Sequence, residues 1–394
     1  MKQIVQLVQS QTTIIGLAIF SMLFGAGNIM YPIKAGVQAG SQNLIGITGF
    51  LITGVLLPII GLIAMILFDG NYKQFFNRIG KIPGNIAILY CLLILGPLIA
   101  MPRCITLPYE MISPFIPAMS LGIFSAIFCL ITFLLTYKES KLLNILGNYI
   151  SPLLVGSLGI IIVKGLVQAE TVTTATKSAI SVFTQQLIHG FQTLDLLGGL
   201  FFAYIVLKIL KETNKDNGTK TKDLAWLALK SGLVGGFLLA IIYIGFSYLG
   251  AFYGHTVTAE MNGAQMFTHI ALTILNSWGA SVIIVAVLMA CFSTISALAV
   301  VFAEYLHDDL FHKKVCYKNS LIITLGATCI ISNFGLTNIL KYGEHPINIG
   351  YPILICIVLF NLMHKLFGVE IIKLPTFVTA VTVTGLYSYF YLLG

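Results

Sequence analysis

Apolar runs long enough to cross a lipid bilayer recur along this sequence from Gln11 onward, separated by short polar gaps. A helix needs roughly 20 apolar residues to cross a hydrocarbon core about 30 Å thick. Only 9% of the 394 residues are charged, whereas soluble globular proteins carry about 25%, and the alternating pattern of β-barrel strands is missing. The sequence therefore predicts an all-α polytopic membrane protein with about 11 to 12 transmembrane helices. The predicted spans are 12–34, 43–68, 82–107, 119–137, 143–167, 185–210, 224–252, 274–304, 319–335, 346–364 and 372–392.

Basic residues gather on one side of these spans. With the N-terminus in the cytoplasm, the inner side receives Lys2, Lys73, Arg78, Lys81, Lys138, Lys141, the lysines between 208 and 230, Lys313, Lys314, Lys318, Lys365 and Lys373. The other side receives Lys34, Arg103, Lys164, Lys177 and Lys341. This asymmetry follows the positive-inside rule. We therefore predict a cytoplasmic N-terminus, and the net charge of +8 does not indicate a nucleic-acid partner.

A single transporter domain is expected to occupy residues 1–394, because no soluble domain interrupts the spans. The longest polar stretch, 211–223, lies near the middle of the chain, as expected if two halves of opposite orientation are joined there. Each half contains a glycine-interrupted span, at residues 25–27 and 198–199, and paired interrupted spans point to the binding site of a transporter. We assign a first repeat to about 1–170, a second to about 180–364 and an extra C-terminal helix to about 372–392.

The first span is interrupted by the sequence Phe24-Gly25-Ala26-Gly27-Asn28. A helix break inside a bilayer leaves backbone polar groups that water cannot satisfy, so it persists only beside protein or a polar cavity. The free N–H groups at such a helix start suit an anion such as a substrate carboxylate. A close-packed helix interface would use the same small residues, so both interpretations stay open.

Two adjacent hydroxyl groups, Ser293 and Thr294, follow Ala290 in the eighth predicted span. Hydroxyl oxygens can coordinate a hard cation, and sodium is the natural candidate. The carbonyl groups of Ser21 and Phe24, just before the first break, could also hold a cation. Alternatively, the two hydroxyls bond the backbone carbonyls one turn before them.

Three of these features lie at one depth. At 1.5 Å of rise per residue, Gly25, Gly198 and Ser293 are each about 15 to 20 Å from a membrane surface. Asp195, close to Gly198 and Gly199, is the only carboxylate inside the sixth span, and intramembrane carboxylates are costly and usually functional. It could bind a substrate ammonium, complete a cation site, carry a proton or make a structural hydrogen bond.

Arg103 and Glu110 would share one helix face if the third span continued through Pro108. They could form an outer gate that closes over bound substrate, or an interfacial ion pair at a helix end. The histidines and aspartates of segment 307–312 are expected to be a solvated helix end. No catalytic or nucleotide-binding motif occurs in the sequence, so we expect no enzyme, and energy from an ion gradient.

These residues resemble the branched-chain amino acid:cation symporter family, the bacterial branched-chain amino acid transport system II carriers. The resemblance rests on Phe24-Gly25-Ala26-Gly27-Asn28 with Pro32, Gly49 to Val55 with Pro58, Gly96-Pro97-Leu98 through Pro102-Arg103 to Tyr109-Glu110, Thr193-Leu194-Asp195, Ser293-Thr294 with Ala303-Glu304-Tyr305, and Ser332 to Leu336. It implies membership of the amino acid/polyamine/organocation superfamily. It also implies a leucine-transporter-like 5+5 inverted repeat, with twelve spans usual for the family against eleven here.

The resemblance also implies the residues of the two binding sites. The substrate would be held by Gly25, Ala26, Gly27, Asn28, Asp195, Gly198, Gly199, Phe201 and Phe202, with a second helix break around residues 198–202. Sodium would be held by Ser21, Phe24, Ala290, Ser293 and Thr294.

We therefore expect a secondary active symporter that imports leucine, isoleucine and valine with sodium, by alternating access, across a bacterial cytoplasmic (inner) membrane. Proton coupling (H+ in place of Na+), or exchange of another neutral amino acid, is the alternative. A polytopic enzyme or amino-acid sensor would need a catalytic cluster or a soluble output domain, and the sequence has neither. The expected partners are the amino acid and the lipid bilayer, with no cofactor beyond the coupling ion and no obligate protein partner.

Overall fold

Helices build the part of the chain that the structure describes. The computed structural model describes residues 11–115, 117–138, 141–175, 177–213, 221–258 and 260–393, and no strand occurs among them. Seven helical segments of the described residues are long and apolar enough to cross a membrane. The predicted all-α membrane fold is confirmed. The middle of the predicted polar linker, 214–220, lies outside the described residues.

The helices follow one another through short connections. The chain begins with α2 (Gln11–Leu23), α3 (Ala26–Ala39), α4 (Asn43–Leu51), α5 (Leu57–Leu67), α6 (Tyr72–Asn77), α7 (Lys81–Leu93), α8 (Ala100–Ile112), α9 (Leu121–Thr136), α10 (Leu142–Ile145) and α11 (Ser151–Val167). It continues with α12 (Ala179–Phe191), α13 (Asp195–Thr213), α14 (Thr221–Tyr253), α15 (Gly263–Leu275), α16 (Gly279–Glu304), α17 (Tyr317–Ser332), α18 (Leu336–Phe367) and α19 (Lys373–Leu393). Within the described ranges, π-helical turns at Ile52–Leu56, Ile94–Leu98, Leu146–Ile150 and Tyr305–Leu310 adjoin these helices.

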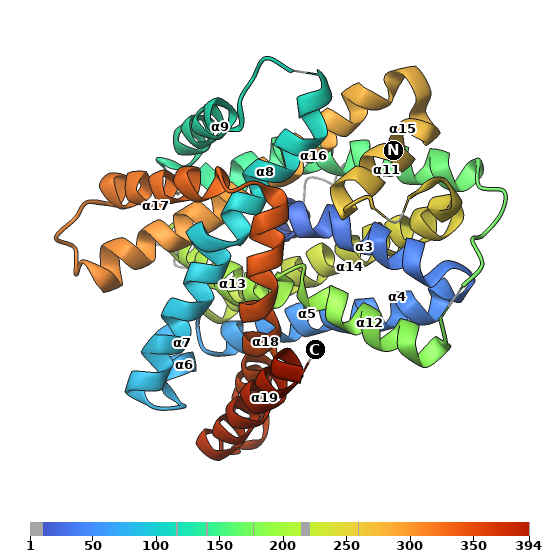
Figure 1. The fold of residues 1–394 in the computed structure, drawn as a ribbon. Coiled ribbons are helices and arrows are strands. Elements are labelled where there is room, and N and C mark those ends of the chain that lie inside the picture. Colours follow the sequence, from blue (N-terminus) through green and yellow to red (C-terminus); the bar gives the residue numbers. More distant parts are fainter. Residues whose placement is uncertain are drawn as a thin grey trace.

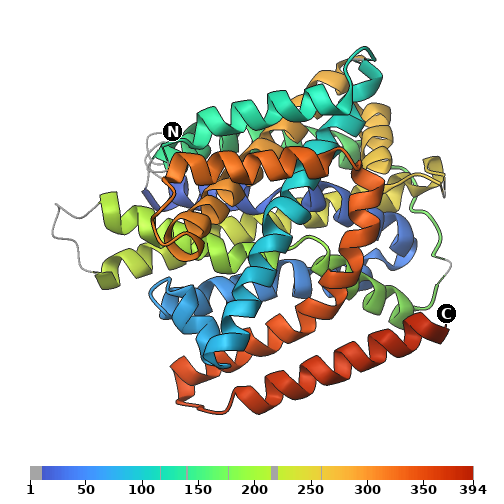
Figure 2. The ribbon, with the colours of Figure 1, turned by 60° about the vertical axis from the view of Figure 1, so that its left-hand side comes forward.

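Helix α14 lies in the middle of the bundle and packs along both α2 and α3 (Figure 1). Helix α13 packs on α5, α12 on α4 and α16 on α8, which gathers the interrupted spans in the interior. Helix α19 packs on α18 and follows one outer edge of the molecule (Figure 2). Large apolar side chains such as Ile123, Leu130 and Leu134 of α9 are exposed, as expected of surfaces that face lipid tails.

The first predicted span is broken where the sequence indicates. Helix α2 ends at Leu23 and α3 begins at Ala26, and the Gly25 backbone between them is extended rather than helical. The first span therefore consists of two helical pieces that meet inside the bundle.

The predicted break at residues 198–202 of the sixth span is wrong. Helix α13 runs without interruption from Asp195, and the break precedes it at residues 192–194, where Leu194 has a φ of 68°. Aspartate favours the first turn of a helix because its charge complements the helix dipole. The glycines serve close packing instead, since a Cβ atom on Gly199 would lie 2.5 Å from a backbone oxygen of α5.

The eighth predicted span also begins later than residue 274. Helix α15 ends at Leu275, the next residue, Asn276, has a φ of 54°, and α16 begins at Gly279. The reversal at Asn276 separates α15 from the span.

The third predicted span is bent by Gly96 and Pro97. Gly96 has non-helical φ and ψ of −88° and −131° inside the π-helical turn, and Pro97 has no N–H group to donate. Beyond the bend, α8 continues through Pro108, so Arg103 and Glu110 do lie on one helix.

Candidate functional site

A small cavity lies between the two helix breaks, α8 and α16. Its volume is about 30 Å³, which is room for about two water molecules. Its lining includes the predicted site residues Gly25, Ala26, Gly27, Asn28, Arg103, Asp195, Gly198, Phe202 and Thr294. Met22, Leu23, Leu95, Ala100, Cys104, Thr193, Leu194 and Leu298 complete it. A ligand the size of an amino acid therefore requires these walls to move apart.

The carboxylate of Asp195 joins the two helix breaks. Asn28 Nδ2 donates to both of its oxygens, at 2.8 and 3.0 Å, and the Tyr243 hydroxyl donates to Oδ2. Asp195 is 2% exposed, and a buried carboxylate is costly unless donors satisfy it. Its hydrogen bonds tie the start of α13 to the first turn of α3 and to α14.

The start of α3 lies directly against the second break. The N–H group of Gly25 donates to Asn28 Oδ1 at 3.0 Å, while the next N–H groups of the first turn have no acceptor within their own helix. A Cβ atom on Gly27 would lie 3.2 Å from Thr193 Cα and 3.3 Å from Gln192 O. A side chain at this position would require the two breaks to move apart by a few tenths of an ångström.

Oxygen atoms of α2 and α16 converge beside this cavity. Ser293 Oγ lies 2.7 Å from Ser21 O, 2.8 Å from Met289 O and 2.9 Å from Ala290 O, and Thr294 Oγ1 lies 3.3 Å from Ser21 O. A serine hydroxyl has one hydrogen, so it can donate to only one of these three carbonyl oxygens. A group of neutral oxygens with more lone pairs than hydrogens suits a hard cation such as sodium.

The oxygen cluster is continuous with the first helix break. Phe24 N–H bonds to Phe20 O at 2.8 Å, so the Phe24 carbonyl is placed just past the end of α2. A Cβ atom on the next residue, Gly25, would lie 2.9 Å from Thr294 Oγ1. The residues suited to a cation and those suited to an anion therefore touch each other.

Arg103 and Glu110 are not paired with each other. Arg103 Nη1 donates to Gln192 O at 3.1 Å, while Glu110 Oε1 accepts from Asn262 Nδ2 at 2.5 Å. Gln192 belongs to the second helix break, and Asn262 caps α15. The predicted ion pair is thus not formed, and α8 instead contacts both the break and α15.

Two of the predicted substrate residues, Gly199 and Phe201, do not line the cavity. Phe201 stacks on Phe76 with ring centroids 6.2 Å apart, and it lies 5.8 Å from the ring of Tyr72. Residues four apart share one face of a helix. Because α13 is continuous, Phe202 therefore faces the cavity together with Gly198, and the three residues between them do not line it.

Three polar residues of the site were not predicted from the sequence: Gln192, Thr193 and Tyr243. Gln192 stands three residues before Asp195, and an aspartate opening an apolar run is a helix-start signal that points to a break before it. Tyr243 carries no local signal, because it lies in the long apolar helix α14.

The polar segment 307–312 contacts residues that do not line the cavity. Asp309 accepts from the Tyr72 hydroxyl and pairs with Lys73, and His307 Nδ1 lies 2.6 Å from Val315 O. Across the described ranges, no group of three His, Cys, Asp or Glu side chains is arranged to hold a metal ion.

The chain matches the model of the family described as branched-chain amino acid transport protein over residues 8–392. The branched-chain amino acid permease BraB of Bacillus subtilis (strain 168) is 30% identical over 386 residues, which cover 96% of this chain and 84% of the permease. The branched-chain amino acid permease BrnQ of the same organism is 28% identical over 367 residues, which cover 91% and 82%.

Solved structures share the fold at low sequence identity. Mhp1, a nucleobase-cation-symport-1 family transporter in a closed conformation, matches with a TM-score of 0.61 and 13% identity over 96% of this chain and 92% of its own. A Na+-coupled sialic acid symporter matches with a TM-score of 0.58 and 13% identity, over 95% and 88%. MhsT in complex with L-phenylalanine matches with 0.56 and 16%, over 94% and 99%.

These matches confirm the leucine-transporter-like fold, and the family model spans nearly the whole sequence. The chain therefore belongs to the branched-chain amino acid transport protein family and is a multi-pass membrane transporter rather than an enzyme.

Proposed function

We propose that this chain is a secondary active symporter that imports leucine, isoleucine and valine together with sodium. The proposal places it in a bacterial cytoplasmic membrane with a cytoplasmic N-terminus. The observation that carries it is the oxygen cluster of Ser21, Ser293 and Thr294, which touches the helix start at Gly25. The names of the two permease relatives support the substrate class.

The cavity has the two kinds of surface that a neutral amino acid requires. The first turn of α3 offers N–H groups and the positive end of a helix dipole to the carboxylate. Met22, Leu95, Phe202 and Leu298 provide an apolar wall. Each CH₂ group buried against such a wall contributes about 0.8 kcal/mol, which favours a branched aliphatic side chain over a polar one.

Sodium and substrate would act on the same segment of backbone. A cation between the carbonyls of Ser21, Phe24 and Ala290 and the hydroxyls of Ser293 and Thr294 would hold α2 against α16. Gly25, which follows Phe24 and precedes the helix start that would bind the carboxylate, packs on Thr294. Coupling between two ligands is reciprocal, so sodium should raise the affinity for leucine by the same factor by which leucine raises the affinity for sodium.

The contacts at both ends of the cavity support alternating access. On the side assigned to the cytoplasm, Glu304 of α16 accepts from Tyr204 at 2.7 Å and pairs with Lys208 at 2.6 Å, both on α13. On the other side, Glu110 of α8 contacts Asn262 before α15. Opening toward either side requires one of these polar contacts to separate.

The test is uptake of labelled leucine into proteoliposomes under an imposed sodium gradient or an imposed proton gradient. Ser293→Ala and Thr294→Ala should weaken the sodium dependence of uptake before they change the preference among amino acids. Thr324→Ala is the matched control, because the buried Thr324 hydroxyl donates to its own helix, at Ser320 O, over 2.8 Å. Uptake that responds to neither gradient would rule out symport.

Proton coupling through Asp195 is the second candidate, and the burial of this carboxylate among the neutral donors of Asn28 and Tyr243 favours it. An Asp195→Asn variant cannot exchange a proton at this position. If the proton is the coupling ion, the variant loses uptake driven by a pH gradient but retains exchange of leucine for leucine. If sodium is the coupling ion, sodium-driven uptake persists in the variant.

A further inference from the structure

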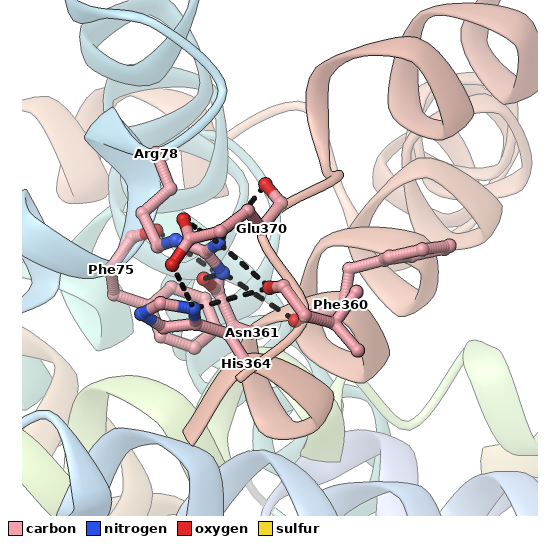
Figure 3. Close-up of polar contacts among 7 residues, drawn as sticks. Phe75, Arg78, Phe360, Asn361, His364 and Glu370 are labelled. Atoms are coloured by element: carbon pink, nitrogen blue, oxygen red, sulfur yellow. Dashed lines mark hydrogen bonds and ion pairs between the residues drawn. The ribbon is translucent and has the colours of Figure 1, made fainter. Parts of the chain in front are cut away.

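The two arginines of the sequence, Arg78 and Arg103, have very different surroundings. Arg78 lies beside the connection between α18 and α19 (Figure 3). Its Nη1 donates to Phe360 O at 3.4 Å and to Asn361 Oδ1 at 3.0 Å. Its Nη2 donates to two further backbone oxygens, at 3.2 and 3.4 Å. The chain itself thus supplies acceptors to both terminal nitrogens of this guanidinium.

Arg103 is more deeply buried and has fewer acceptors. It is 2% exposed, and Nη1 donates to Gln192 O at 3.1 Å. Its Nε and Nη2 atoms have no hydrogen-bond partner among the residues that the structure describes. A guanidinium offers five N–H donors in a planar fork, so most of this capacity is unused.

Two carboxylates near Arg103 are engaged with other residues, and a third, Glu344, which follows Gly343 beside Arg103 Nη2, is exposed. Glu110, on the same helix, accepts from Asn262, and both oxygens of Asp195, on the same cavity, accept from Asn28. A buried cation without a paired anion is strongly disfavoured, above all within a membrane. The surroundings of Arg103 are therefore those of a site that an anion from outside the chain completes.

We propose that Arg103 binds the carboxylate of the transported amino acid through Nε and Nη2. This inference rests on the proposed function, because it takes the substrate to be an amino acid. The two nitrogens form one edge of the guanidinium, and such an edge matches the two oxygens of a carboxylate in a bidentate pair. Arg103 lines the cavity, and its buried Nη2 lies beside Gly343 of α18, so the carboxylate reaches Nε and Nη2 when the walls move apart to admit the substrate.

The arginine and the start of α3 can act on the same carboxylate. The oxygen of Gln192 that accepts from Arg103 would lie 3.3 Å from a Cβ atom on Gly27, so the guanidinium and the first turn of α3 flank one carbonyl group. The positive end of a helix and a guanidinium both favour an anion between them. Arg103 thereby belongs to the substrate site, in place of the outer gate predicted from the sequence.

The experiment measures binding by the purified protein in saturating sodium, by isothermal titration, with leucine and with leucinamide. Leucinamide keeps the side chain and the ammonium group but replaces the carboxylate with a neutral amide. Arg103→Gln should lower the affinity for leucine about 10- to 100-fold, the range for a lost charge-assisted hydrogen bond, while the affinity for leucinamide is unchanged. Arg103→Lys, which keeps the charge but loses the fork, should fall between the wild type and Arg103→Gln.

Arg78→Gln is the matched control. It removes the other arginine, whose terminal nitrogens have acceptors, and should leave the ratio of leucine to leucinamide affinity at the wild-type value even if less protein folds. Thermal unfolding without ligand further distinguishes Arg78→Gln from Arg103→Gln. Arg78→Gln should lower the unfolding temperature, whereas Arg103→Gln should leave it unchanged or raise it, because it removes a buried charge without a counter-ion.

The proposal is overturned if Arg103→Gln and Arg103→Lys keep the wild-type affinity ratio, or if both ligands lose affinity equally. It is also overturned if leucine binding by the wild type requires chloride and Arg103→Gln abolishes that requirement, since chloride would then be the bound anion. A wild-type protein that binds neither ligand contradicts the proposed function instead. Arg103→Lys retains the charge and supplies the comparison if Arg103→Gln does not fold.

Discussion

Removal of the Tyr243 hydroxyl tests the hydrogen-bond network that joins the two helix breaks. In Tyr243→Phe the ring can keep its edge-on contact with Phe50, at 5.2 Å and 90° between centroids and planes, while the hydrogen bond to Asp195 is lost together with the one accepted from Asn28. A hydrogen bond to a charged group contributes about 1.5 to 3 kcal/mol, whereas hydrogen bonds between membrane helices average about 0.6 and reach about 1.7 kcal/mol. Because the acceptor is a buried carboxylate, we expect a loss of about 1.5 kcal/mol, near the overlap of these ranges.

This loss should lower the unfolding temperature by about 2 °C, because an unfolding entropy of about 2.1 cal/mol/K per residue corresponds to about 1.2 °C per kcal/mol for 394 residues. The measurement is thermal unfolding of the purified protein in detergent, with leucine uptake recorded on the same preparation. Tyr248→Phe, further along α14 and half-buried, is the control. A cycle with Asp195→Asn isolates the coupling between the two side chains. The reasoning is refuted if Tyr243→Phe unfolds at the same temperature as the control, or if its effect persists in full when Asp195 is already replaced.

Two further substitutions test packing and burial. Gly27→Ala should reduce leucine affinity and stability, because its Cβ atom meets the backbone of the second break at 3.2 Å, and overpacking of this kind costs about 1 to 3 kcal/mol. Gly326→Ala, inside α17 and with no heavy atom within 4 Å of the added Cβ, should leave uptake unchanged and should not lower the unfolding temperature. Lys208→Gln should lower the unfolding temperature more than Lys73→Gln, because Lys208 pairs with a Glu304 side chain that is 2% exposed, whereas the Lys73 side chain is 53% exposed in its own ion pair. Equal effects of the two lysine variants would contradict this account of the contact.

The part of the fold that local sequence determines could be predicted. Apolar runs of sufficient length dictate membrane helices, and the pair Gly25 and Gly27 beside Asn28 marks a break, because glycine and a buried amide together disfavour a continuous apolar helix. The pair Gly198 and Gly199 has the same local appearance but a different cause. Its second member accommodates the backbone of α5, and such close packing depends on a helix far away in the sequence.

The candidate site, like the fold, could be predicted only where it depends on local sequence. Depth along the helices predicted that Ser293 lies at the level of Gly25, and the family resemblance implied that Ser293 and Thr294 lie beside Ser21. The contact of Tyr243 with Asn28 joins residues 215 positions apart, and no pattern around either residue signals it. Arg103 was recognised from its type and position, but its acceptor, Gln192 O, is a backbone atom exposed by a break whose location only the packed structure determines.

The bend at Gly96 and Pro97 allows the two ends of the third span to move independently. In a straight helix, a tilt of one end is transmitted to the other end. Missing hydrogen bonds at Pro97 and the non-helical Gly96 make this point the most compliant of the span. Displacement of α7 can therefore be absorbed at the bend, while α8 keeps Arg103 in register with residue 192. In the proposed alternating access, this bend would let the cavity open to one side of the membrane at a time, and a carrier that is never open to both sides at once does not let its coupling ion leak across.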